Sequence, residues 1–327
     1  MRFFIINFIF SIVFLSLASA SDNLAVVYTF DKQNDKRFNE FTSKDLREIG
    51  YFLNDPHHRV NDAYEVQFGK TDLELIGFSS ILNEEVVRPL LSIDPRLGGF
   101  SPFNLLNYRK KSDNVTVVAH LTPEAILDIL EIKDKEIHKK YIASFKPLDD
   151  LIQKRLGGKK SYIPVKGRAK NTMMHFEIAF EEPEDIDDFL EEFQEKFEFA
   201  FETQGFVIAG FYNIKESFYS EEDAMPMYTS FWSYALCHIP YSYTVFDGKD
   251  AFPVAGIFAP CSMYIYVKEG ENKLVIGMPT LSAWASALGI TNQKKLNYIN
   301  QLDEDIPAIL KGLGAKVVAN GNPLLRK

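Results

Sequence analysis

Two stretches of this chain decide its fold: DPRLGGFSPFNLLNYRKKSDNVTVV at residues 94–118 and FPVAGIFAPCSMYIYVKEGENKLVI at residues 252–276. The second follows the first at an offset of 158 residues. The identical pairs are Pro95/Pro253, Gly98/Gly256, Phe100/Phe258, Pro102/Pro260, Tyr108/Tyr266, Lys110/Lys268, Asn114/Asn272 and Val117/Val275. Because ordered identity at one fixed spacing is the signature of an internal repeat, we predict one unit present twice.

The repeat extends well beyond these stretches and sets the expected domain organisation. Identities continue to Ile132/Ile290, and after a slip of one residue they resume at Tyr141/Tyr298 and run to Gly157/Gly314. Residues 154–170 between the copies contain seven basic side chains and no acidic one, which is typical of either a solvated connector or an anion patch. We therefore expect a first, degenerate repeat domain at 21–158, a basic linker at 159–172, a second repeat domain at 173–314 and a tail at 315–327.

The composition is that of an ordinary globular protein. Of the 327 residues, 46% are hydrophobic and 25% are charged. The two cysteines exclude a disulfide-dense scaffold, a four-cysteine zinc site and a classical iron–sulfur site. The net charge of −9 argues against nucleic acid and anionic membrane surfaces as partners.

The N-terminus has the pattern of a secretory signal peptide at residues 1–20. Arg2 supplies the charged region, Phe3 to Leu17 are almost purely apolar, and Ala18-Ser19-Ala20 is a small-residue cleavage site. The apolar run is shorter than the roughly 20 residues needed to span a bilayer, and no later segment is as apolar. We therefore expect a periplasmic or secreted protein with no stable membrane insertion after cleavage.

The second copy has the clearer secondary-structure pattern. Alternation predicts strands at 174–180, 206–214 and 231–239, and a hairpin at 263–268 and 273–278. Pro183 is expected in the first turn of a helix whose core face is a stripe of apolar side chains. Helical patterns also cover 282–288 and 306–313. The stripe consists of Ile186, Phe189, Leu190, Phe193, Phe197 and Phe201.

The first copy is less regular. Its first strand is predicted at 23–30, and Thr42 is expected to cap a helix at 43–53. The predicted fold class is α+β, with two tandem domains in which a helix packs on an antiparallel sheet.

The cysteines lie in a pattern that resembles a known family. Cys237-His238-Ile239-Pro240 ends one strand, and Ala259-Pro260-Cys261 opens the apolar strand Met263-Tyr264-Ile265-Tyr266. This resembles the domain-of-unknown-function 302 family, over residues 173–314 and more weakly 24–158. The departure is His238-Ile239, where the family pattern has Asn. At the offset of 158, Ser79 and Phe103 replace the two cysteines in the first copy.

The resemblance implies a fold rather than an activity. It implies small α+β domains with a helix-grip or TATA-binding-protein-like topology that tend to pair. A tandem copy could then pair within the chain as a pseudo-twofold dimer, or between chains as a homodimer.

Cys237 and Cys261 are the first candidates for chemistry, and three roles remain open. Neighbouring strands could bring the sulfurs together as a disulfide in an oxidising compartment. The thiols could instead be buried and inert, or they could form a reactive or metal-binding pair. With His238 they would suit a soft metal such as Cu(I) or a haem axial position, because six methionines also lie in the second copy.

Aromatic residues gather between residues 218 and 246. Trp232, Tyr234, Tyr241 and Tyr243 could wall an apolar ligand pocket, or they could form the seam between the two copies. His57-His58 follows Pro56 in a polar stretch and is expected to be a solvated loop.

No motif in the sequence specifies a reaction, so a catalytic role is not expected. We predict an exported binding or accessory protein that holds a small apolar ligand or a partner protein at the second repeat. The first copy is then expected to be structural. The alternative is a thiol- or soft-metal-dependent function (redox, copper or haem) at Cys237, His238 and Cys261.

Overall fold

The computed structural model describes residues 22–31, 35–216, 225–248 and 250–318. The predicted signal peptide lies outside these ranges, as does the tail after residue 318. Among the helices in these ranges, none combines the length and apolar character that a bilayer crossing requires.

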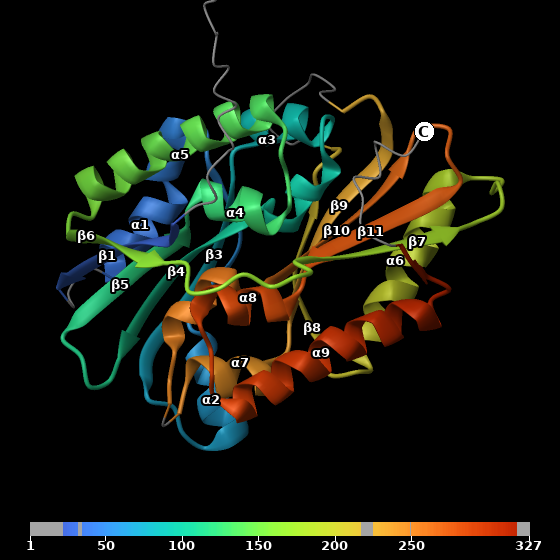
Figure 1. Cartoon of the computed structure of the whole chain (residues 1–327). Helices are drawn as coiled ribbons and strands as arrows, with labels where there is room; N and C mark the ends of the chain where they lie inside the picture. Colours follow the sequence, from blue (N-terminus) through green and yellow to red (C-terminus); the bar gives the residue numbers. More distant parts are fainter. Residues whose placement is uncertain (1–21, 32–34, 217–224, 249, 319–327) are drawn as a thin grey trace, which may run out of the picture.

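The first half is a six-stranded antiparallel sheet with helices (Figure 1). Its strands are β1 (Asn23–Asp31), β2 (Phe52–His57), β3 (Leu73–Leu82), β4 (Phe103–Lys110), β5 (Val115–Leu121) and β6 (Lys159–Pro164). Its α-helices are α1 (Asp35–Ser43), α2 (Val60–Phe68), α3 (Glu84–Leu91), α4 (Pro123–Ile129) and α5 (Lys135–Arg155), and its 3-10 helices are η2 (Asp45–Ile49) and η3 (Pro95–Phe100).

The second half repeats this plan in its described residues. Its strands are β7 (Met173–Ala179), β8 (Val207–Asn213), β9 (Tyr228–Cys237), β10 (Cys261–Lys268), β11 (Lys273–Pro279) and β12 (Lys316–Val317). Its helices are α6 (Ile186–Glu202), α7 (Ile239–Phe246), the 3-10 helix η4 (Pro253–Phe258), α8 (Leu281–Leu288) and α9 (Gln293–Gly312).

The two sheets have the same topology. The strand order is β2-β3-β4-β5-β1-β6 in the first sheet and β8-β9-β10-β11-β7-β12 in the second. The fold is therefore α+β with two tandem domains, as the sequence predicted. Two six-stranded sheets lie side by side, with α5 across one and α6 and α9 beside the other (Figure 1).

Local capping is also duplicated, which explains part of the sequence identity. The Thr122 hydroxyl accepts from the backbone N–H of Ala125 at 3.2 Å and begins α4. At the same place in the second half, the Thr280 hydroxyl accepts from Ala283 at 3.1 Å and begins α8. A threonine at this position satisfies one of the unpaired N–H groups of each helix.

Each half packs a short helix against the sheet of the other half. An added Cβ on Gly98 of η3 would lie 2.7 Å from Cβ of Tyr264 on β10. An added Cβ on Gly256 of η4 would lie 2.9 Å from Cδ1 of Leu106 on β4. The exchange is reciprocal, and the buried apolar residues of both halves form one contiguous cluster.

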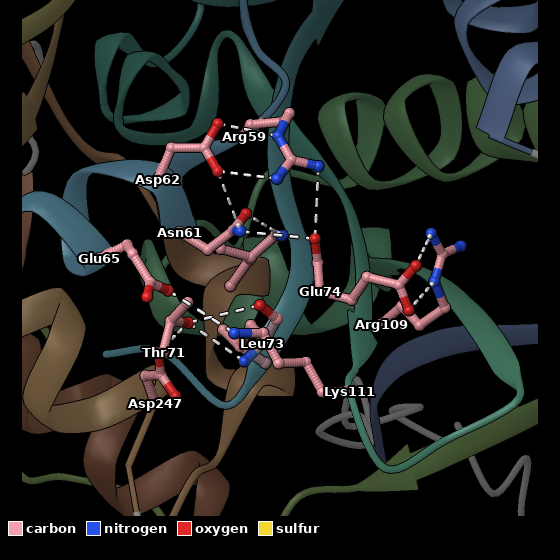
Figure 2. A network of polar contacts seen from close by, with 11 residues as sticks. Arg59, Asn61, Asp62, Glu65, Thr71, Leu73, Glu74, Arg109, Lys111 and Asp247 are labelled. Carbon is pink, nitrogen blue, oxygen red and sulfur yellow. Dashed lines mark hydrogen bonds and ion pairs between the residues drawn. The ribbon is translucent and has the colours of Figure 1, made fainter. Parts of the chain in front are cut away.

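Buried polar contacts also join the halves. Nδ2 of Asn104 donates to the Gly256 carbonyl at 2.6 Å, and the Tyr228 hydroxyl donates to the Leu91 carbonyl at 2.9 Å. Asp247, at the end of α7, accepts from the Thr71 hydroxyl (Figure 2) and also from the backbone N–H of Asp72. Such bonds satisfy polar groups that lose water when the halves meet.

Several expected elements differ in the structure. The helix expected at 43–53 is wrong, because α1 ends at Ser43 and Gly50 ends η2 in the left-handed conformation (φ 76°). Thr42 lies inside α1, where its hydroxyl donates to the Phe38 carbonyl at 3.2 Å. Pro183 precedes α6, whose cap is Asp185.

The predicted linker and tail both contribute edge strands. Residues 159–164 form β6, which pairs with β1, and residues 316–317 form β12, which pairs with β7. The connector therefore belongs in part to the first sheet.

The strand register corrects the alignment of the two cysteines. Phe103 does replace Cys261, but the register pairs Phe103 with Ile81 and Cys261 with Leu236. Cys237 therefore corresponds to Leu82 rather than to Ser79. The offset of 158 does not hold in β3 and β9, where it is 155 residues.

Adding a methyl group at the exchanged contacts is expected to destabilise the protein. Gly98→Ala should lower the free energy of unfolding by about 1–3 kcal/mol, because the methyl group meets packed side chains of β10. Gly312→Ala is the control, since nothing lies within 4 Å of its added Cβ, and it should be neutral or stabilising by about 0.5–1 kcal/mol. Urea denaturation measures both, and equal effects would contradict the described packing.

Candidate functional site

The two cysteines do not form a disulfide in the structure. The register pairs Cys261 with Leu236, so the side chain of the next residue, Cys237, lies on the opposite face of the sheet from that of Cys261. Both thiols are free. Burial raises the pKa of Cys237 to about 11, against a smaller lowering by a hydrogen bond with Ser242, and burial raises the pKa of Cys261 further.

The predicted metal ligands do not converge. Among the described residues, no group of three or more His, Cys, Asp or Glu side chains could hold a metal ion. His238 instead caps α7, where its Nδ1 accepts from the backbone N–H of Tyr241 at 3.3 Å. An asparagine at this position, as in the family pattern, would provide the same acceptor.

Trp232 and Tyr234 are buried in the interior of the second half. The Tyr234 ring lies 4.7 Å from the ring of Phe197 on α6. Its hydroxyl accepts from Gln194 and donates to Glu198, both at 3.1 Å. These contacts place the Tyr234 side chain, which extends from β9, against α6.

Tyr241 and Tyr243 lie on α7, and Tyr243 faces the other half. The Tyr243 ring stacks on Phe68 of α2 with centroids 4.1 Å apart, and it meets Tyr64 edge-on at 5.6 Å. Tyr241 is buried, and burial raises its pKa well above the usual value. The structure thus places Tyr243 at the seam between the copies, and none of the four aromatic residues lines the cavities described below.

A cavity of about 410 Å³ lies between the two halves, where the edge strands β2 and β8 meet. Most of its walls are apolar. The first half contributes residues 56–60, Ala63 and Phe78, and the second half contributes residues 207–209, Cys237, Ile239 and Pro260.

A few polar groups also line this cavity. Nε2 of His57 contacts the Ala209 carbonyl at 2.5 Å and so joins β2 to β8. The Arg59 guanidinium makes two bonds of 2.8 Å to the Asp62 carboxylate (Figure 2). His57, expected in a solvated loop, is therefore part of the boundary between the halves, whereas His58 is exposed in the bend after β2, as expected, and lines the cavity.

The cavity can accommodate a ligand but has no activated nucleophile. A volume of 300–1,000 Å³, apolar walls and a few polar groups at a domain boundary are typical of small-molecule sites. Cys237 is a protonated thiol near neutral pH because its pKa is about 11. It therefore contributes to the wall as a small, weakly polar group.

A second cavity of about 200 Å³ lies between α4, α8 and the connector. Its walls include Ala125, Ile129, Ala283 and Ala287. It is smaller than the usual range for ligand sites.

The first half also contains a polar cluster that the sequence analysis missed. The Tyr28 hydroxyl donates to Oδ1 of Asp149 at 2.5 Å, and Nε2 of His120 lies 3.1 Å from the same oxygen. Lys160 donates to the other carboxylate oxygen at 3.1 Å. His120 is fully buried, and its Nδ1 lies 2.8 Å from the Leu121 carbonyl.

Charge interactions in this polar cluster are strong. Burial alone would raise the pKa of Asp149, but the hydrogen bond and charge of His120, with bonds from Tyr28 and Lys160, lower that pKa well below its usual range. Burial and the neighbouring carboxylate raise the pKa of Tyr28 far above its usual value. The Asp149 side chain is 22% exposed, so the polar cluster reaches solvent.

The second half has apolar residues at all four equivalent positions. Three alignments define these positions. The β1–β5 and β7–β11 registers align the strand residues, the β6 and β12 pairings align the edge strands, and the one-residue slip of the repeat aligns the long helices. Tyr28, His120, Asp149 and Lys160 correspond to Phe176, Met278, Ile306 and Val317. The repeat alignment already contained this signal for His120 and Asp149, since it places them against Met278 and Ile306.

Comparisons with known proteins add one similarity. No family model and no curated protein matches the sequence. A solved structure titled as an uncharacterized conserved protein DUF302 from Bacillus stearothermophilus is similar over 42% of this chain and 95% of that chain, with 16% identity and a TM-score of 0.33. The chain is thus similar to a protein of the family that the cysteine pattern suggested.

Replacing the polar cluster tests whether the fold needs it. Asp149→Ile alone should lower the free energy of unfolding by about 3–5 kcal/mol, because it leaves His120 and Lys160 without their carboxylate. The quadruple variant Tyr28→Phe/His120→Met/Asp149→Ile/Lys160→Val, which installs the residues of the second copy at all four positions, should return to within about 1 kcal/mol of the original. Urea denaturation measures both, and a quadruple variant as unstable as the single one would show that the fold depends on these polar groups.

The His238 cap predicts a pH-dependent stability. Burial lowers the pKa of His238, with Asp305 acting in the opposite direction. The neutral His238 ring therefore contributes fully to the free energy of unfolding above the unfolded-state pKa of 6.5. This contribution is lost as the pH falls from 6.5 through the lower pKa of His238 in the folded protein. Thermal unfolding between pH 8 and pH 5 should show this loss in the original protein.

His238→Asn is the matched variant, since Asn83 already caps the equivalent helix α3 by accepting from Val86 at 3.3 Å. Asparagine does not titrate, so the stability of this variant should lack the pH-dependent contribution of His238. The difference in stability between the variant and the original protein should therefore change below pH 6.5. A constant difference across the range would rule out the described role of Nδ1.

Proposed function

We propose that this protein is a non-catalytic binding protein that holds a small, mainly apolar ligand in the cavity between its two halves. The observation that carries the proposal is the cavity of about 410 Å³, whose walls come from both copies. Neither repeat alone encloses it.

The chemistry of the walls supports an apolar ligand with a limited polar part. Val60, Phe78, Val207 and Ile208 supply apolar surface, and burying such surface gives about 25 cal/mol per Å². The imidazoles of His57 and His58 add hydrogen-bonding groups to the same boundary. A ligand would therefore gain most of its affinity from apolar contact and its orientation from the histidines.

This proposal places the site at the junction of the repeats rather than on the second repeat alone. It gives the first copy a direct role, because α2 and β2 form one wall of the cavity. We further propose that the protein acts after export, on the strength of the signal-like residues 2–20.

A residue that fills the cavity should abolish binding. Ala63 is exposed on α2 and lines the cavity, so Ala63→Trp should weaken binding of the fluorescent probe anilinonaphthalene sulfonate, which has apolar aromatic rings and one sulfonate, at least tenfold. Ala308 is likewise an exposed helical alanine, but it lines a different groove on α9. Ala308→Trp is therefore the matched control and should leave the probe affinity unchanged, as measured by fluorescence titration.

The free thiol gives a second measurement at the same site. Bound probe should slow alkylation of Cys237 by N-ethylmaleimide, because this thiol lines the cavity. Equal probe affinity in Ala63→Trp and Ala308→Trp, or unchanged alkylation with bound probe, would refute the proposed site.

A further inference from the structure

A groove separate from the ligand cavity lies between α6 and α9. Figure 1 shows both helices in the second half. Its volume is about 610 Å³, and its lining is mixed. The small or apolar part consists of Ala200, Ala308, Ile309, Gly312 and Leu313, and the polar part consists of Lys196, Thr203, Gln204 and Asp305. Small residues allow the backbone of a docked segment to approach closely.

Phe199 stands at the wall of this groove and is 69% exposed. The core face of α6 consists of Leu190, Phe193, Phe197 and Phe201, all buried. Phe199 does not belong to that face. A large exposed aromatic ring beside a groove is typical of an interaction surface.

The segment that contains α6 is strongly acidic, while the charged side chains of the groove lining itself are Lys196 and Asp305. Residues 181–202 contain eleven acidic side chains and one basic side chain, Lys196, and so carry a net charge of −10, whereas the whole chain carries −9. Lys196 is itself paired with Glu192 at 2.6 Å. Glu195 and Glu202 are exposed on the same helix, and Glu304 is exposed on α9.

The equivalent surface of the first half has different chemistry. The hollow beside α1, η2 and α5 has charged side chains as its walls, including Lys36, Arg37 and Glu40. Arg155 of α5 bridges to Glu48 of η2 at 2.5 Å and to Asp45 at 3.5 Å. Because the same fold has ion pairs there, the open groove of the second half is not a requirement of the fold.

We propose that the groove between α6 and α9 docks a basic amphipathic helix from a partner protein. The apolar side of that helix would cover Phe199 and the floor of the groove, and its Lys or Arg side chains would face the acidic residues of α6. α6 has 17 residues, which corresponds to about 25 Å of helix, so a partner segment of about five turns matches its length.

Charge complementarity selects this occupant over the others. Nucleic acid and anionic membrane surfaces would meet a segment of like charge. A second copy of this chain would bring the same acidic surface and a net charge of −9. A basic helix alone offers both an apolar side and the opposite charge.

Fluorescence anisotropy tests the proposal with a labelled 18-residue amphipathic helix of Leu and Lys, and with the same peptide carrying Glu for Lys. We expect the Lys peptide to bind, at least tenfold more weakly in 300 mM than in 50 mM salt, and the Glu peptide not to bind. Phe199→Ser should weaken Lys-peptide binding at least tenfold. Val66→Ser is the matched control, since Val66 is 88% exposed on α2, and it should have no effect.

The double variant Glu195→Lys/Glu202→Lys tests the charge separately, because it reverses the charge of two exposed residues of α6. It should weaken binding of the Lys peptide at least tenfold. Binding of the Glu peptide, equal effects of Phe199→Ser and Val66→Ser, or Phe199-dependent self-association in sedimentation would each overturn the proposal. Probe binding in the cavity should not change in Phe199→Ser, so the two proposals can fail independently.

Discussion

The reciprocal packing of two short helices is the contact on which the whole molecule depends. η3 of the first half lies on β10, and η4 of the second half lies on β4. Gly98 and Gly256 occupy equivalent positions at these contacts, where a side chain would collide with the opposite sheet. Because each half buries part of its apolar surface only against the other, the two sheets are separate but the interior is shared.

Much of the fold could be predicted from sequence because its signals are local. The repeat, the hairpin between β10 and β11 and the threonine-capped helices α4 and α8 depend on residues close in the chain. The equivalence of Cys237 and Leu82 could not be predicted, because insertions elsewhere shift the alignment while hydrogen-bonded pairing sets the register.

The candidate site was harder to predict for a related reason. Residues of α2, β2 and β8 contribute to the cavity, and they meet only because the edge strands β2 and β8 of the two separate sheets lie against each other. The concentration of aromatic residues on β9 and α7 was a true signal of burial. Some of these aromatic side chains pack against α6 and others lie at the seam between the copies. Which of the two occurs depends on the helix that covers each face of the sheet, and no local sequence pattern specifies that helix.

Positions at which the two copies differ show where the shared fold does not require one particular side chain. At one set, the first copy has the half-buried Asp149 and the buried His120 with their hydrogen-bond partners, while the second copy has apolar side chains. A buried ionic group seldom adds stability over a well-packed apolar one. At another set, the second copy has the open groove beside Phe199, where the first has ion pairs.

Since one fold tolerates both versions at each set, packing alone does not account for the polar cluster or for the groove. The polar cluster is therefore a feature of the first copy alone, and the open groove beside Phe199 is a feature of the second.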